Sequence, residues 1–122
     1  MKRINIKNTF RLLILANGLI SSIITIQIIN NILYKTEFSS VTLSIILSYG
    51  LVWFFSLYKL YNFSKKGLTL YIVLVCVGYI FNILSNFNEF NRFFYILTLT
   101  EHLIIGSIIT FSLFTKIKSL FK

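Results

Sequence analysis

The chain has 122 residues, of which 57% are hydrophobic and only 12% are charged. A soluble domain carries about 25% charged residues, so this chain has too few polar side chains to cover a compact domain in water. It is also too apolar for a disordered chain. The formal net charge of +9 would suit a nucleic-acid surface, but the basic residues stand between and beside long apolar runs, as in membrane proteins. We therefore expect an integral protein of the lipid bilayer that binds no nucleic acid.

Charged residues divide the chain into four long apolar runs. Three are free of charge over 23, 21 and 22 residues, and the fourth, of 23 residues, is interrupted only by Glu101. A hydrocarbon core about 30 Å thick needs about 20 helical residues, and in lipid a helix satisfies all its own backbone hydrogen bonds. The sequence therefore predicts an all-α, single-domain membrane protein with transmembrane helices at 12–34, 38–60, 67–87 and 93–115.

The connections between these runs are short, which favours antiparallel packing of consecutive helices. We expect an up-down-up-down bundle of four helices. Gly67 follows Lys65 and Lys66, and we expect it to help the chain bend between the second and third helices.

The basic residues are distributed unequally between the two sides of the predicted bundle. Ten of the twelve fall on one side: Lys2, Arg3, Lys7, Arg11, Lys59, Lys65, Lys66, Lys116, Lys118 and Lys122. The opposite side has only Lys35 and Arg92. By the positive-inside rule, both termini are expected in the cytoplasm, with the protein in the cell (plasma or inner) membrane. Most of the net charge then lies where anionic lipid headgroups can meet it.

Aromatic residues cluster near the predicted helix ends, where Trp and Tyr anchor membrane proteins at headgroup depth. Tyr58, Tyr61, Phe63 and Tyr71 are expected near the inner membrane surface.

Small and polar residues recur at four-residue spacing within the apolar runs. Small residues let helices approach closely in lipid, and hydroxyl and amide groups can bridge neighbouring helices. The positions interpreted as helix-packing contacts are Gly18, Ser44, Ser48, Gly78 and Gly106.

Glu101 is the one acidic residue within a predicted span. An acid at mid-helix costs about 2.5–3.5 kcal/mol on insertion, and an ionisable residue inside a membrane is by default a hypothesis of function. In the antiparallel order, other polar residues lie at a similar depth in the outer half of the membrane. The candidate intramembrane polar site comprises Glu101, His102, Gln27, Asn30, Asn82 and Thr98.

Glu101 and His102 are consecutive, so their side chains point about 100° apart on a helix. Two arrangements follow. Glu101 could bond to Gln27 or Asn82 inside the bundle while His102 meets a second subunit. Alternatively, both could line an aqueous pocket that opens to the outside, where they would exchange protons.

The inventory of catalytic groups is small, with one His, one Cys and three acids. It contains no Ser-His-Asp set, no carboxylate pair at one depth, no metal-ligand spacing and no phosphate-binding loop. We therefore expect that the protein is not an enzyme and that it has no catalytic residue, no metal and no cofactor.

Two functions remain open. The first is a small polytopic protein that acts through helix–helix interaction, as an accessory subunit or an immunity-type protein, with another membrane protein or a second copy as partner. The second is a minimal proton-coupled transporter or channel that works as a homo-oligomer, with Glu101 as its titrating group.

Overall fold

The computed structural model describes residues 5–34, 40–84 and 91–122. These ranges contain α1 (Ile6–Tyr34), α2 (Ser40–Tyr61), α3 (Lys65–Leu84), α4 (Arg92–Phe114) and the short 3-10 helix η2 (Lys116–Leu120). All four α-helices are long and apolar enough to cross a membrane, which confirms the predicted membrane-length helices. The parts of the predicted spans at 38–39 and 85–87 lie outside the described residues.

The first helix begins earlier than its apolar run, at Ile6 instead of residue 12. Its start is supported by Asn5, whose Oδ1 accepts from the amide of Lys7 at 3.2 Å. Arg11 lies on the helix wall, with its guanidinium carbon 4.6 Å from the centre of the Tyr61 ring. Arg11 therefore bounds the apolar run but lies within the helix, where its cation packs on an aromatic ring.

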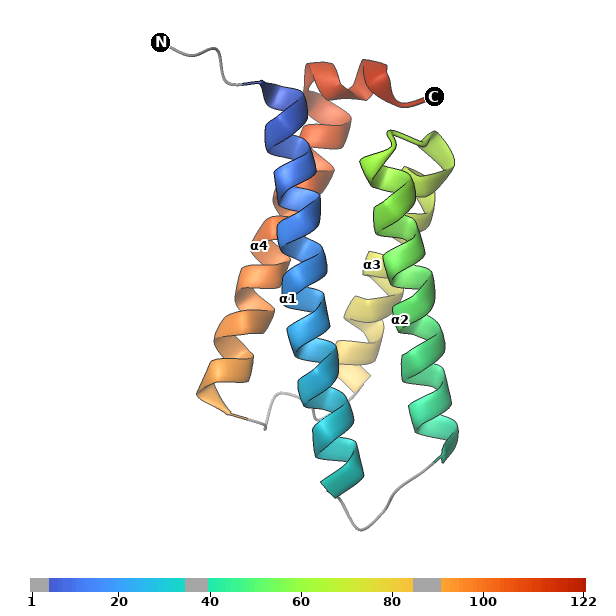
Figure 1. Ribbon diagram of the computed structural model, residues 1–122, viewed down its shortest axis with the longest axis vertical. Coiled ribbons are helices and arrows are strands. Elements are labelled where there is room, and N and C mark those ends of the chain that lie inside the picture. The colour runs from blue at the N-terminus through green and yellow to red at the C-terminus, as the bar shows by residue number, and fades with distance from the viewer. Residues whose placement is uncertain (1–4, 35–39, 85–90) are drawn as a thin grey trace.

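The helices are not packed equally against one another (Figure 1). α1 packs against α4 and α2, and α2 packs against α3, whereas α3 and α4 share much less contact. Consecutive helices are therefore close neighbours in the first two pairs, as expected, but only weakly in the last. It follows that α4 is held in the bundle mainly by α1.

The turn between α2 and α3 bends at Phe63, which has a φ of 56°. Gly67, which was predicted to help the bend, instead lies in the first turn of α3. A Cβ at Gly67 would come within 2.5 Å of the Cβ of Lys59, so glycine is required there for the close approach of α2 and α3. The prediction that Gly67 helps the turn to bend was therefore wrong, because glycine at this position serves the packing of α3 against α2.

The C-terminal segment folds back onto this turn. The amide of Lys65 donates to the carbonyl of Lys122 at 2.8 Å, and the amide of Lys122 donates to the carbonyl of Phe63 at 3.1 Å. The ring of Phe63 lies 5.7 Å from each of the rings of Phe10 and Phe121, between centroids. The start of α1, the α2–α3 turn and the C-terminal segment thus share one end of the bundle, called the turn end below (Figure 1).

Candidate functional site

The carboxyl group of Glu101 is hydrogen-bonded inside the bundle. Ser21, on the buried face of α1, places its hydroxyl oxygen 2.5 Å from Oε1 of the half-buried Glu101 on α4. The same hydroxyl lies 3.0 Å from Oδ1 of Asn17, one turn earlier on α1. This contact joins the two helices that pack most extensively with each other.

Two aromatic side chains extend this contact to the other two helices. Nε1 of Trp53 on α2 donates to the hydroxyl of Ser21 at 3.0 Å. Nδ2 of Asn17 donates to the phenol oxygen of Tyr71 on α3 at 2.6 Å. Asn17, Ser21, Trp53, Tyr71 and Glu101 together are called the polar network. Each of the four helices contributes at least one member, and all but Glu101 are buried.

Local sequence explains how these groups meet. Asn17 and Ser21 are four residues apart, so both lie on the same face of α1. Trp and Tyr side chains bring a large apolar ring and one polar atom, which needs a partner when it is buried. The rings of Trp53 and Tyr71 pack against each other with their centroids 5.1 Å apart. Ring packing therefore places both polar atoms next to α1.

The hydrogen of the Ser21 hydroxyl can go to only one of its two oxygen neighbours. The hydroxyl of Ser21 has one hydrogen to donate, yet it faces the oxygen atoms of both Asn17 and Glu101. An ionised Glu101 would take that hydrogen and leave Oδ1 of Asn17 without this partner. A neutral Glu101 donates to Ser21, and Ser21 then donates to Asn17. With the Asn17 amide oriented as in the structure, a neutral Glu101 acting as donor is the form that satisfies all of these contacts.

The structure does not gather the other predicted site residues around Glu101. Gln27 and Asn82 are half-buried and Asn30 is exposed. Within the described ranges, no hydrogen bond joins any of these three to Glu101, whose partner is Ser21. The hydroxyl of Thr98 donates to the carbonyl of Phe94 on its own helix, at 2.9 Å.

His102 lies on the exposed side of α4, away from the polar network. Its Nδ1 is 2.6 Å from the carbonyl oxygen of Thr98, one turn earlier on the same helix. Because a carbonyl oxygen only accepts hydrogen bonds, Nδ1 carries a hydrogen in this contact. Glu101 and His102 therefore face different surroundings despite being consecutive.

The three predicted packing glycines in the helices differ in what surrounds them. A Cβ at Gly78 would lie 2.5 Å from the phenol oxygen of Tyr49, which donates to the carbonyl of Leu74 at 2.8 Å. A Cβ at Gly18 would be 3.7 Å from Leu57, an ordinary contact. At Gly106 no described atom would lie within 4 Å. Among these three, only an added side chain at Gly78 would force a neighbouring group, the phenol of Tyr49, to move.

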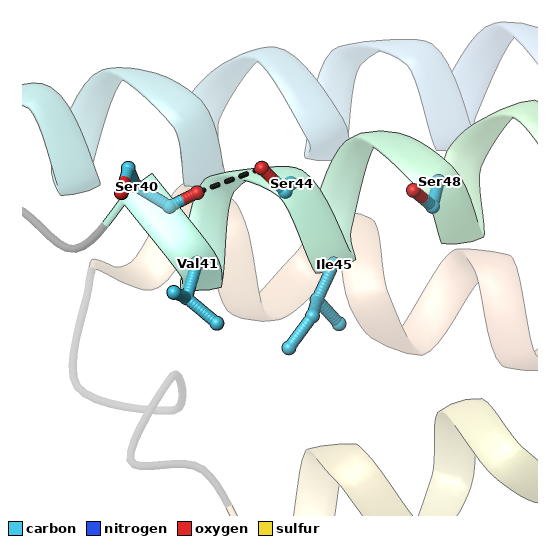
Figure 2. A pocket seen from close by; sticks show the side chains of 5 residues that line it. All are labelled: Ser40, Val41, Ser44, Ile45 and Ser48. Atoms are coloured by element: carbon cyan, nitrogen blue, oxygen red, sulfur yellow. Dashed lines mark hydrogen bonds between the residues drawn. The ribbon is translucent and has the colours of Figure 1, made fainter.

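The predicted packing serines Ser44 and Ser48 line a shallow hollow on the outside of α2 (Figure 2). The hollow has a volume of about 430 Å³, and Ser40, Val41 and Ile45 complete its lining. The hydroxyl of Ser44 donates to the carbonyl of Ser40 at 2.8 Å. Both serines are exposed, so within the described chain they do not pack against another helix.

Sequence reasoning did not connect Asn17 and Ser21 with Glu101. It missed Trp53 as a site residue, and it treated Tyr71 only as an aromatic residue near the membrane surface, not as a buried member of a hydrogen-bond network. The available signal was that each aromatic residue lies inside a long apolar run and carries a polar atom that must find a partner.

The structure is that of a helical protein with four helices long and apolar enough to cross a membrane, and the polar network links all four through hydrogen bonds. In comparisons with known proteins, no protein family, curated protein or solved structure matches the chain. Among the described residues, no group of three or more His, Cys, Asp or Glu side chains could hold a metal ion.

Proposed function

We propose that this chain is a non-enzymatic multi-pass protein of the cell membrane that acts through helix–helix interaction. Its role is that of an accessory subunit or an immunity-type protein, and its partner is another membrane protein or a second copy. The helices cross in up-down-up-down order with both termini in the cytoplasm, which the unequal distribution of Lys and Arg supports. The observation that carries the proposal is the division of α4 into an inward side with Glu101 and an exposed side with His102.

The exposed side of α4 offers a surface suited to another helix. It is called the α4 outer face and consists of Leu99, His102, Leu103, Gly106 and Thr110. Gly106 leaves open space in its centre, into which a facing side chain fits. Nδ1 of His102 is used by the carbonyl of Thr98, which leaves Nε2 as the ring nitrogen that a polar group of a partner can hydrogen-bond.

Site-specific photocrosslinking tests this proposal. A photoreactive residue at Leu103 on α4 is compared with one at Leu19 on α1, because the two leucines are 74% and 69% exposed. We expect crosslinked protein from position 103 and little from position 19. The change Gly106→Phe should reduce the product at position 103 at least about fivefold, because a partner helix can no longer approach. A protein that stays monomeric, or crosslinks equally at both positions, would contradict the proposal.

The proton-coupled alternative is less well supported because Glu101 is engaged by Ser21 within the bundle. The change Glu101→Gln distinguishes the two functions. Glutamine keeps a donor and an acceptor but cannot release a proton. An interaction protein should keep its cellular phenotype with this change, whereas a proton-coupled transporter should lose it.

A further inference from the structure

A groove lies at the turn end of the bundle, between the last turns of α2 and the first turns of α3. It has a volume of about 270 Å³ and is lined by Phe55, Lys59, Ser64, Lys66, Gly67 and Leu70. Two of these side chains are cationic and two are large and apolar. The groove therefore combines a cationic part with a hydrophobic part.

The close approach of α2 and α3 at Gly67 shapes this groove. Because Gly67 has no Cβ, the backbone of α3 packs directly against Lys59, and Lys59 and Lys66 come to border the same hollow. The ammonium of Lys59 lies 5.4 Å from the centre of the Phe55 ring, a cation–π contact that holds it at the groove. Its charge is not neutralised by this contact and stays available to an anion.

The surroundings of the groove are strongly basic. The segments that meet at the turn end carry the described cationic residues Lys7, Arg11, Lys59, Lys65, Lys66, Lys116, Lys118 and Lys122. Among the described residues the only acid is Glu101, which lies in the middle of α4 and is bonded to Ser21. Charge complementarity therefore selects an anionic occupant.

The order of the lining residues along the helices selects an amphiphile. Phe55 lies four residues before Lys59 on α2, and Leu70 lies four residues after Lys66 on α3. Four helical residues advance about 6 Å, so the apolar wall begins about one turn deeper in the bundle than the two cations. An anionic headgroup at the cations would leave its apolar chain along Phe55 and Leu70.

We propose that this groove binds an anionic phospholipid, with the phosphate between Lys59 and Lys66 and an acyl chain along Phe55 and Leu70. Basic pockets between membrane helices bind phospholipid headgroups in this way. The inference rests on the proposed insertion in a membrane, which places the turn end at its surface. It does not depend on a protein partner at the α4 outer face.

Native mass spectrometry of the full chain tests the proposal. The protein is released from micelles that contain equal amounts of phosphatidylglycerol and phosphatidylcholine with the same acyl chains. We expect one retained phosphatidylglycerol in preference to phosphatidylcholine. The double variant Lys59→Ala/Lys66→Ala should weaken retention about 25-fold, because each lysine near an anionic lipid contributes about a factor of five.

Two further double variants serve as controls. Lys116→Ala/Lys118→Ala removes the same charge from η2, outside the groove, and should change retention less than about threefold. Lys59→Arg/Lys66→Arg keeps the charge and should keep the lipid, and circular dichroism verifies that each variant is folded. Equal losses in the two alanine variants, equal retention of phosphatidylcholine, or full retention after Lys59→Ala/Lys66→Ala would overturn the proposal. Displacement of the lipid by an equal concentration of glycerol 3-phosphate would also overturn it, since it would indicate a site for free phosphate.

Discussion

The hydroxyl oxygen of Ser21 lies 2.5 Å from Oε1 of Glu101, although the two residues are 80 positions apart in the chain. This contact joins α1 to α4, and α4 has little contact with α3. The same hydroxyl accepts from Trp53 on α2, so Ser21 is where three helices meet. The polar network therefore contributes directly to the placement of α4, the helix that we propose faces a partner.

Replacing Asn17 by alanine should destabilise the bundle. The change removes the donor to the buried phenol of Tyr71 and the acceptor that faces Ser21. Leaving buried polar groups without partners costs about 1–2 kcal/mol in a membrane protein, so we expect a loss of that size. The free energy of unfolding in mixed detergent micelles measures it. Asn30→Ala, at an exposed position on the same helix, is the matched control and should have little effect; equal losses in both variants would argue against the network.

Infrared spectroscopy should detect Glu101 in its neutral form. We expect a carbonyl stretching band of a carboxylic acid at pH 7 that disappears in Glu101→Gln and shifts in Ser21→Ala, because that change removes the hydrogen-bond partner of Glu101. The change to glutamine should preserve folding, since its amide also donates to Ser21. If the wild-type protein instead shows the carboxylate bands of Glu101 at this pH, the assignment of Glu101 as a hydrogen-bond donor is wrong.

A methyl group at Gly78 should disturb the contact between α2 and α3. The added Cβ would lie 2.5 Å from the phenol oxygen of Tyr49, which must then leave its bond with the carbonyl of Leu74. Overpacking of this kind costs about 1–3 kcal/mol in the free energy of unfolding.

The change Gly106→Ala is the control for Gly78→Ala, because open space surrounds that position among the described residues. It should leave the stability of the single chain unchanged or slightly higher, since alanine is the better helix former. Combining Gly78→Ala with Tyr49→Phe should recover part of the loss, because the colliding oxygen is removed. Failure of this rescue would show that the collision is not the cause.

Much of the helical structure could be predicted from the sequence, because the length and low charge of the apolar runs are direct consequences of membrane thickness. The start of the first helix could not be predicted in the same way. Arg11 was taken as the residue before the helix, whereas it lies on the helix and contacts the ring of Tyr61. An aromatic partner from a distant segment is not visible in a count of charges.

The error at the start of α1 also explains why the partner of Glu101 was missed. The expected span 12–34 has its midpoint at Ile23, while the observed helix Ile6–Tyr34 has its midpoint at Ile20. Ser21 therefore lies just past the midpoint of α1, on the side away from the turn end. Glu101 lies on the same side of the midpoint of α4, which is Leu103. With the expected bounds, Gln27 was placed at the depth of Glu101 instead.

Hydroxyl groups were the other source of error. Serine and threonine were expected to bridge neighbouring helices, but several donate to the carbonyl four residues earlier on their own helix. Examples are Ser22, Thr25, Thr98 and Thr110. This local bond competes with bonds between helices, and the competition is decided by packing that the sequence does not reveal. Ser21 bridges because Trp53 and Glu101 both reach it.

A double-mutant cycle between Ser21 and Glu101 tests the central claim most directly. The free energy of unfolding is measured for the wild type, Ser21→Ala, Glu101→Ala and the combined variant, all in the same micelles. Because the two side chains form a hydrogen bond inside the bundle, we predict a coupling energy of about 0.5–1.7 kcal/mol. Effects that simply add, with no coupling beyond experimental error, would contradict the account.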